Sequence, residues 1–142
     1  MSKVFLDANV PMYAAGKDHA LREPCQWIMI EIAEGRLSTV IDAEIVQEIL
    51  YRYGSIKKRQ TGARLAKNVM SIVPEIISVT SADMETTIEL YEIYSSDQIP
   101  ARDCLHAAVM INNGIEEIIS VDGEFDLIKE VKRTDPRKIA PG

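Results

Sequence analysis

The chain has 142 residues, of which 46% are hydrophobic and 27% charged, and its formal net charge at pH 7 is −6. This composition is ordinary for a globular domain, which excludes a fibrous or largely disordered protein and leaves enough apolar side chains for one independent core. The apolar stretches are too short to span a bilayer and the chain leads directly into a strand, so we expect a soluble, cytoplasmic protein with no membrane association.

The first predicted element is a strand at residues 3–6, where Val4, Phe5 and Leu6 form an unbroken apolar run. Such a run suits a central strand of a parallel sheet, buried on both faces. Asp7 ends the strand, and ligands of open α/β sheets bind outside the carboxyl ends of the strands. Asn9 can either cap the short helical segment predicted at 10–15 or bind a metal ion.

The following residues predict an alternation of helices and strands. We expect a helix from Leu21 to Gly35, a strand at 38–41 and a second helix capped by Asp42. At about 100° per residue, Glu48 lies on the flank of the apolar stripe of that second helix, whereas Glu44 lies on its more exposed side. Glu48 is therefore the acid expected to reach inward.

A helical arm is predicted around residues 42–73, with Gly54 ending its first helix and Ser55 capping its second. No acid occurs between Glu48 and Glu75, whereas six basic residues do: Arg52, Lys57, Lys58, Arg59, Arg64 and Lys67. Because contact with nucleic acid depends on local charge, these side chains are candidate phosphate contacts. A solvated helix face produces a similar run, and both interpretations stay open.

The last part of the chain repeats the pattern of a strand closed by an acid. A strand at 76–79 and a helix at 81–94 precede a helix beginning at Pro100, so that Asp103 falls in a first turn. There the helix dipole stabilises a carboxylate by about 0.3–1 kcal/mol. A strand at 117–121 then ends at Asp122, as the first strand ends at Asp7. A short helix at 125–128, a strand at 130–133 and a loose tail from Asp135 complete the prediction, and the alternation indicates an α/β fold with a parallel sheet.

Asp7, Glu48, Asp103 and Asp122 are the candidate site. Clustered carboxylates repel one another and raise each other's pKa, so such a cluster needs protons or a hard cation. Oxygen ligands alone select Mg²⁺ or Mn²⁺, and two such ions about 3.5–4 Å apart would suit the cleavage of a phosphodiester. Acids at strand ends and in first helical turns also occur simply as caps, so spacing alone leaves a structural role open.

Other chemistries have weaker support in the sequence. His106 lies one helical turn from Asp103 and can either orient it or be a satisfied histidine at the rim of the core. Cys104 and His106 do not share a helix face, which disfavours a nucleophilic pair, and with His19 and Cys25 they lack the spacing of a zinc site. No Gly-x-Gly-x-x-Gly or Walker A pattern occurs, so no nucleotide cofactor is predicted.

Four short motifs, taken in order and spacing, resemble the PIN-domain nucleases and, within them, the VapC-like toxins of prokaryotic toxin–antitoxin pairs. The motifs are Phe5-Leu6-Asp7-Ala8-Asn9, Val46-Gln47-Glu48-Ile49-Leu50-Tyr51, Arg102-Asp103-Cys104-Leu105-His106-Ala107-Ala108 and Ser120-Val121-Asp122-Gly123-Glu124-Phe125-Asp126. The resemblance covers nearly the whole chain. Gly123 departs from the family pattern, in which a polar residue is common after the last acid.

The resemblance implies a single PIN-like domain over residues 1–142, built as a three-layer α/β/α sandwich around a central parallel sheet of about five strands. It also implies endonucleolytic cleavage of RNA, a small antitoxin partner and a homodimer. Metal binding and catalysis would fall to the four acids with Mg²⁺ or Mn²⁺ as cofactor, Asp126 would be a further metal ligand, and Asn9 and His106 would support the site. The basic residues of the arm would bind the RNA.

Three alternatives stay open at this point. The first is an RNA-processing PIN nuclease without a toxin role, and the second is an inactive interaction module that keeps the fold. The third is an aspartate-based phosphatase or phosphotransfer domain in which Asp7 is phosphorylated, although Asn9 stands where such enzymes usually carry a second aspartate. Metal binding and RNA cleavage would discriminate among these functions.

Overall fold

A computed structural model describes residues 3–141 of the chain. Its central sheet has five strands in the order β3-β2-β1-β4-β5, and each neighbouring pair is parallel. The strands are β1 (Val4–Leu6), β2 (Thr39–Asp42), β3 (Glu75–Ile77), β4 (Glu117–Ile119) and β5 (Lys132–Thr134). The predicted parallel sheet of about five strands is therefore confirmed.

Helices cover both faces of this sheet. Those preceding β3 are α1 (Asn9–Ala15), α2 (Arg22–Ala33), α3 (Ala43–Ser55) and α4 (Arg59–Ile72). Those following β3 are α5 (Ser81–Ile93), α6 (Ala101–Asn112), the 3₁₀ helix η1 (Gly123–Leu127) and α7 (Pro136–Ile139). No helix within residues 3–141 is long and apolar enough to cross a membrane.

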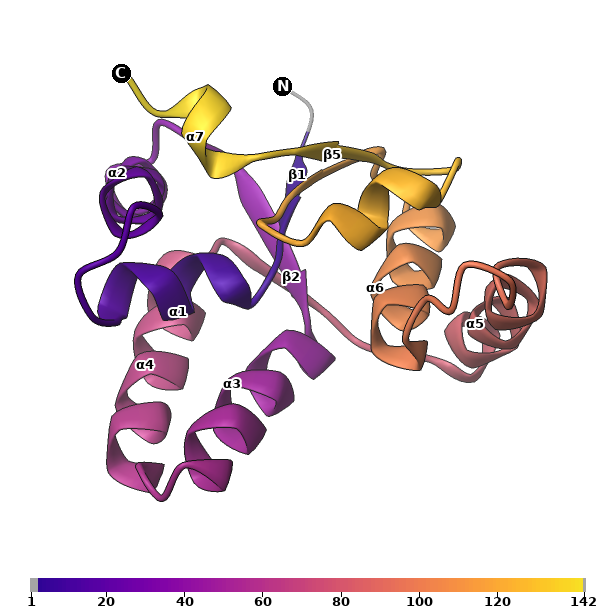
Figure 1. Cartoon of the computed structure of the whole chain (residues 1–142), viewed down its shortest axis with the longest axis horizontal. Helices are drawn as coiled ribbons and strands as arrows, with labels where there is room; N and C mark the ends of the chain where they lie inside the picture. The colour runs from indigo at the N-terminus through magenta and orange to yellow at the C-terminus, as the bar shows by residue number, and fades with distance from the viewer. Residues whose placement is uncertain (1–2, 142) are drawn as a thin grey trace.

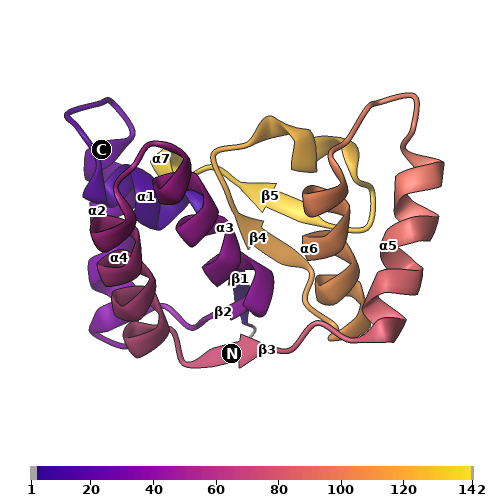
Figure 2. The ribbon, with the colours of Figure 1, turned by 90° about the horizontal axis from the view of Figure 1, so that it is seen from below.

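The order of the strands explains the three layers. The chain moves outward from β1 through β2 to β3 and then returns to β4 on the other side of β1. Because crossovers between parallel strands are right-handed, reversing the direction of travel places the connecting helices on the opposite face. Figure 2 shows this result, with α1, α2 and α4 on one side of the sheet and α5 and α6 on the other. The predicted α/β/α sandwich is confirmed.

The core lies where the apolar strands predict it. Phe5 and Leu6 of β1 and Ile118 of β4 are fully buried, and each such side chain contributes roughly 1.5–3 kcal/mol relative to exposure. Ala107 and Ala108 of α6 are also fully buried, and their small size lets the helix lie close to the sheet. The close packing fixes the carboxyl ends of β1 and β4 beside the first turn of α6.

Helices α3 and α4 form an antiparallel hairpin that projects from the body of the molecule (Figure 1). As predicted, Asp42 caps α3, with its Oδ1 accepting a hydrogen bond of 2.9 Å from the Ile45 backbone N–H. Gly62 lets the two helices approach, because a Cβ there would lie 2.6 Å from the Cβ of Tyr53. Any larger residue at position 62 would therefore push the hairpin apart.

Two predicted caps are wrong. Asn9 is the first helical residue of α1, whose N-cap is Ala8, and the Asn9 side chain bonds to Asp7 and Ser120 instead. Ser55 is the last residue of α3, and α4 starts only at Arg59. In both places the side chain has an available alternative partner, which outweighs the local capping preference.

The prediction of a loose tail from Asp135 is also wrong over the described residues. Asp135 caps α7, its Oδ1 accepting a hydrogen bond of 2.8 Å from the backbone N–H of Arg137. Hydrogen bonds from the Arg137 side chain, together with that backbone bond, lower the pKa of Asp135 to about 2. Helix α7 packs against α2, so this segment closes one end of the fold.

Candidate metal centre and active site

A cavity of about 600 Å³ opens at the carboxyl ends of β1 and β4, where the strand order reverses. Ligands of open α/β sheets bind at this kind of switch point. Its lining includes all four acids singled out in the sequence, Asp7, Glu48, Asp103 and Asp122. They come from β1, α3, α6 and the loop after β4, so the fold brings together side chains distant in sequence.

Asp7 is only 4% exposed, and both of its carboxylate oxygens accept hydrogen bonds. Oδ1 accepts from the backbone N–H of Ala8 at 2.8 Å. Oδ2 accepts from the hydroxyl of Ser120 at 2.6 Å and from the amide of Asn9 at 3.2 Å. Burial raises the pKa of Asp7, although the charge of His106 and the bond from Ser120 oppose the rise. The hydrogen bonds thus fix the carboxyl group in place, and its burial makes the ionised form less favourable than in water.

Ser120 connects the two sides of the cavity. Its hydroxyl oxygen accepts hydrogen bonds from the Asn9 amide at 3.1 Å and from the backbone N–H of Asp122 at 3.0 Å. The amide oxygen of Asn9 accepts in turn from the backbone N–H of Val121 at 3.3 Å. These bonds tie the loop after β4 to the end of β1 and set the position of Asp122 relative to Asp7.

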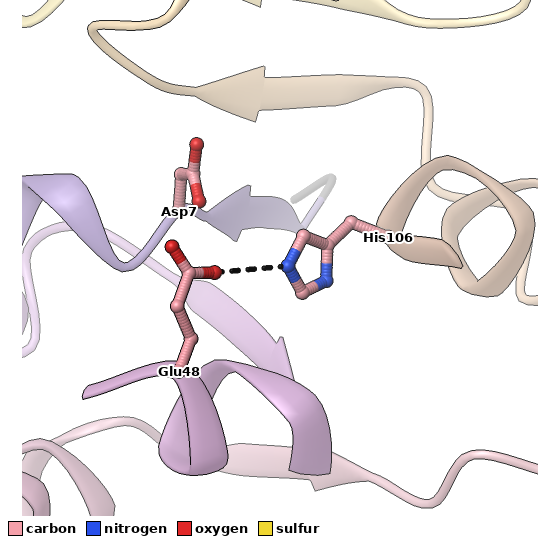
Figure 3. A group of neighbouring side chains, drawn as sticks. All are labelled: Asp7, Glu48 and His106. Atoms are coloured by element: carbon pink, nitrogen blue, oxygen red, sulfur yellow. Dashed lines mark hydrogen bonds and ion pairs between the residues drawn. The ribbon is translucent and has the colours of Figure 1, made fainter. Parts of the chain in front are cut away.

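Glu48 is held by a fully buried histidine (Figure 3). The two ring nitrogens of His106 donate to different acids: Nδ1 lies 2.8 Å from Asp42 Oδ2, and Nε2 lies 3.4 Å from Glu48 Oε1. Asp42 is itself fully buried as the cap of α3. A chain of contacts therefore runs from the α3 N-terminus through His106 to the carboxylate that faces the cavity.

The charges of this chain support one another. Burial opposes protonation of His106, but its hydrogen bonds to Asp42 and Glu48 dominate and raise its pKa to about 10. Burial alone would raise the pKa of Glu48, whereas the bond and charge of His106 and the charges of two arginines lower it below its usual value. Glu48 is therefore ionised and His106 is protonated on both nitrogens at neutral pH.

A second group of acids lies across the cavity. Ligand atoms of Asp103, Asp122 and Glu124 all lie within 4.8 Å of one another. Burial, followed by the nearby charges of Asp122 and Asp7, raises the pKa of Asp103 to about 8. Burial and the charge of Asp122 also raise the pKa of Glu124. Without a cation, this side of the cavity favours bound protons.

The chemistry of the donor set suits a hard divalent cation. Asp7, Glu48 and His106 also form a group with ligand atoms within 4.8 Å, but both His106 nitrogens carry protons directed at carboxylates and cannot ligate a metal. The remaining donors are all carboxylate oxygens, which Mg²⁺ and Mn²⁺ prefer and zinc sites rarely use alone.

Basic side chains line the mouth of the cavity. Lys17, Arg52 and Arg102 belong to its lining. Arg52 lies 3.7 Å from Glu48, and Arg102 lies 3.6 Å from Glu44 and stacks over the ring of Tyr51 at 5.6 Å. An anionic ligand would meet these cations before it reached the acids.

Residues 4–131 match the PIN domain. The chain belongs to the PIN-domain family. Ribonuclease VapC13 of Mycobacterium tuberculosis is 32% identical over 130 residues, which cover 92% of this chain and 98% of that protein. The family recognised from the four sequence motifs is therefore confirmed.

Solved structures share this fold. One is VapC20 of Mycobacterium tuberculosis, described as a toxin that cleaves the sarcin-ricin loop, with a TM-score of 0.75 and 16% identity over 90% of this chain and 96% of that one. Another is VapBC2 of Rickettsia felis, bound to a DNA fragment from its promoter, with a TM-score of 0.73 and 18% identity over 94% of this chain and 98% of that one. At these identities the likeness shows the fold alone.

Two sequence-based candidates for the site lie elsewhere than expected in the PIN fold. Asp126 does not line the cavity: its side chain is 53% exposed, and both oxygens accept hydrogen bonds from Arg133, at 3.0 and 2.9 Å. Of the two roles expected for His106, the structure shows the satisfied histidine: it contacts Glu48 and Asp42 and not Asp103, and it is fully buried instead of lying at the rim of the core. Gly123 has no positive φ angle, so the departure from the family pattern imposes no special backbone geometry there.

Several side chains contribute to the site although no local sequence pattern pointed to them. Glu124, rather than Asp126, has a ligand atom within 4.8 Å of those of Asp103 and Asp122, and its backbone N–H donates a hydrogen bond of 3.0 Å to the Asp122 side chain. Ser120, which the motifs include without a role, connects Asp7 to Asp122. Of the basic residues in the arm, Arg52 lines the cavity, whereas the others lie outside its lining.

Proposed function

We propose that this protein is an endoribonuclease that depends on Mg²⁺ or Mn²⁺ and is the toxin of a toxin–antitoxin pair. The observation that carries the proposal is the gathering of four acids, Asp7, Glu48, Asp103 and Asp122, around one cavity of a PIN fold. A relative with 32% identity is named a ribonuclease, and VapC20, which shares the fold, is described as a toxin that cleaves the sarcin-ricin loop.

The four acids would hold the metal in this proposal, with Glu124 as a further oxygen ligand. Bound there, a divalent cation supplies Lewis-acid stabilisation of the negative charge that develops on a phosphodiester during cleavage. The protein's own contribution is to hold its ligands in place before substrate arrives. Ser120 and Asn9 orient Asp7, and His106 orients Glu48, so little reorganisation is needed.

Arg52, Arg102 and Lys17 would bind phosphates on either side of the scissile bond, because they line the same cavity as the acids. Asp103 would hold a proton near neutral pH until a cation or a basic group displaces it, given its raised pKa of about 8. Metal affinity should therefore increase with pH as protons leave the acids.

The test is cleavage of a mixed pool of RNAs by the purified protein, with Mg²⁺, with Mn²⁺ and with EDTA. We expect fragments only when a divalent cation is present. Asp7→Asn should reduce cleavage at least ~100-fold, because the carboxylate with two fixed oxygens is replaced by a neutral amide. Glu89→Gln, which removes an exposed acid of α5, is the matched control and should cleave normally.

We propose a small antitoxin as the protein partner and a homodimer as the assembly. The antitoxin is supported by structural neighbours that were solved as VapBC complexes, among them those from Rickettsia felis and from Salmonella typhimurium, whereas the homodimer rests on the family resemblance. An inhibitor of the acidic cavity would place a basic side chain near the four acids. Co-purification of a small inhibitory protein supports the toxin role, whereas an active, partnerless protein from its native cells supports RNA processing. Light scattering tests the dimer.

A phosphotransfer role for Asp7 has less support. Asp7 Oδ1 accepts a single hydrogen bond and keeps a free lone pair, so the point against phosphotransfer is Asn9, which stands where such enzymes usually carry a second aspartate. The same carboxylate suits a metal ligand that is held in one orientation. Incubation with acetyl phosphate that left a stable phosphoryl group on the protein would favour phosphotransfer over the nuclease.

A further inference from the structure

We propose that a series of connected hollows, leading from the acidic cavity to the tip of the α3–α4 hairpin, binds the backbone of one single RNA strand. The inference rests on the proposed nuclease function and adds to it the path of the substrate. We refer to this series of hollows as the hairpin track.

The hairpin track is continuous because adjacent hollows share lining residues. The acidic cavity shares Met12, Gly16, Lys17 and Arg52 with a second hollow of about 570 Å³, which lies between α1 and the hairpin. The second hollow shares Lys58 and Thr61 with a third of about 520 Å³ at the hairpin tip. An RNA strand with one end bound at the acids can therefore follow a continuous depression in the surface to the hairpin tip.

The charge of the hairpin track fits a polyanion. Among the described residues that line the second hollow, Lys17, Arg52 and Lys58 are basic and none is acidic. This composition is unusual for a chain with a net charge of −6. Clustered lysine and arginine side chains attract the phosphates of a nucleic acid regardless of its base sequence. An acidic partner peptide would have to carry a similar density of negative charge to bind in the same way.

The size of the hollows suits nucleotides of an unpaired strand. Each has a volume within the roughly 300–1,000 Å³ typical of small-molecule pockets. The side chain of Ile56, which is 59% exposed, lies beside Lys58 in the second hollow and offers an apolar surface to a base. Proteins that recognise single strands combine such surfaces with cations that follow the backbone.

The backbone at the hairpin tip provides a second, independent observation. Lys57 has φ of 61° and follows the end of α3, where its N–H bonds to the Gly54 carbonyl and the N–H of Lys58 bonds to the Tyr53 carbonyl. This is a Schellman motif, in which glycine is usual because other residues lose roughly 1–2 kcal/mol in the left-handed region. Strained positions that retain a functional side chain are common at binding sites, and here the side chain is a lysine in the third hollow.

The length of the hairpin track sets the length of RNA that it can bind. Lys58 follows Glu48 by ten residues in the sequence. At about 1.5 Å per residue, Glu48 lies roughly 10 Å along the helix axis from Ser55, the last residue of α3. Lys58 stays beside that end because its N–H bonds to the Tyr53 carbonyl, so a few nucleotides can span the distance. An RNA of two nucleotides would occupy the acidic cavity alone, whereas a longer strand would reach the tip.

The test measures binding of a fluorescein-labelled, mixed-sequence, 12-nucleotide single-stranded RNA by anisotropy, over a series of salt concentrations. All proteins carry Asp103→Asn to slow cleavage. The test variant adds Lys57→Gln with Lys58→Gln, two lysines of the hairpin track that lie outside the lining of the acidic cavity, and the control adds Arg64→Gln with Lys67→Gln, which removes two exposed positive charges of α4 outside the hairpin track. We expect the test pair to reduce the log-affinity versus log-salt slope by about 1.4, or about 0.7 for each phosphate that is no longer neutralised. The control pair should leave the slope unchanged, and a labelled dinucleotide should bind the test variant and its parent equally.

Equal slopes for the test and control pairs would overturn the proposal, because the effect would then be one of general charge. An unchanged RNA slope together with weaker inhibition by the co-purifying partner would also overturn it and would make the hairpin track a protein-docking surface. Because the readout is binding and not cleavage, these outcomes are separate from a failure of the proposed nuclease function, which would appear as absence of cleavage by the unmodified protein.

Discussion

Removing the charge of Asp103 should stabilise the metal-free protein. Its carboxyl group has a usual pKa of 3.8, which burial and the charges of Asp122 and Asp7 raise to about 8. The folded state thus holds a proton that the unfolded chain releases, so the free energy of unfolding falls as the pH rises from about 4 to about 8. Asp103→Asn removes the titrating group and should abolish this part of the pH dependence.

The expected gain follows from the size of that shift. A pH of 7 lies about three units above the usual pKa of this carboxyl group, and each unit corresponds to about 1.4 kcal/mol. The upper limit of the stability gained by the substitution at pH 7 is therefore roughly 4 kcal/mol. Asp103 is only partly buried, which screens the repulsion, and the substitution also loses about 0.3–1 kcal/mol of favourable interaction with the α6 dipole. A net gain of about 1–3 kcal/mol remains, equivalent to roughly 3–12 °C in Tm at this chain length.

Thermal unfolding followed by circular dichroism in EDTA, at pH 5, 7 and 8, measures this gain. The gain should be smallest at pH 5 and largest at pH 8, and Glu89→Gln on the surface of α5 should give none. Adding Mn²⁺ should reverse the ranking, because the cation stabilises the original protein more than the variant. If Asp103→Asn were no more stable than the original protein at pH 8 in EDTA, the acids would not be repelling one another and the argument for a cation site would fail.

Four further substitutions test other parts of the structure. His106→Gln should lower the free energy of unfolding by roughly 3 kcal/mol or more, because it leaves buried carboxylates without their cation. Since the pKa of His106 is raised to about 10, the stability that protonated His106 contributes is complete below pH 6.5 and is lost between pH 6.5 and 10. This decline in stability should be absent from the variant. Lys57→Gly should raise stability by about 1 kcal/mol in denaturant titrations while weakening RNA binding, and a loss of stability would contradict the strain at φ 61°. Asp126→Ala should change stability by less than about 1 kcal/mol and preserve cleavage, whereas Asp122→Ala should abolish it; equal losses would restore Asp126 as a metal ligand.

Local sequence predicted those parts of the site that depend on one element at a time. The apolar run of β1 placed Asp7 at a strand end, and helical periodicity selected Glu48 over Glu44 as the inward acid, which agrees with its exposure of 8%. The first turn of α6 likewise contains Asp103. Each of these positions follows from a local signal that the sequence contains directly: an unbroken apolar run for Asp7, the 3.6-residue helical period for Glu48 and a helix start at Pro100 for Asp103.

The contacts that hold the acids in place connect distant parts of the chain, and no local pattern contains them. His106 reaches Asp42 across 64 positions, and Ser120 reaches Asp7 across 113. Asp42 was predicted as a helix cap, but a cap needs only one of its two oxygens, and the partner of the other depends on how α6 packs against α3. The positions of Glu124 and Asp126 likewise depend on distant contacts. Arg133 binds the carboxylate of Asp126, which lies in the short 3₁₀ helix, and Glu124 is the acid near Asp103 and Asp122.

The buried His106 gives a physical reason to expect that this chain folds without a bound metal. Asp7, Asp42 and Glu48 are each buried, and the single positive charge of His106 lies among them and contacts two. Because this cation is part of the chain, it offsets one carboxylate charge permanently, and the remaining negative charge suits a divalent ion. In structural zinc sites, by contrast, the metal supplies the folding free energy and its removal unfolds the domain. We therefore expect the protein to unfold cooperatively in EDTA, with Mn²⁺ increasing Tm in a concentration-dependent manner. A chain that was unfolded in EDTA would show that the metal, rather than His106, holds the acids together.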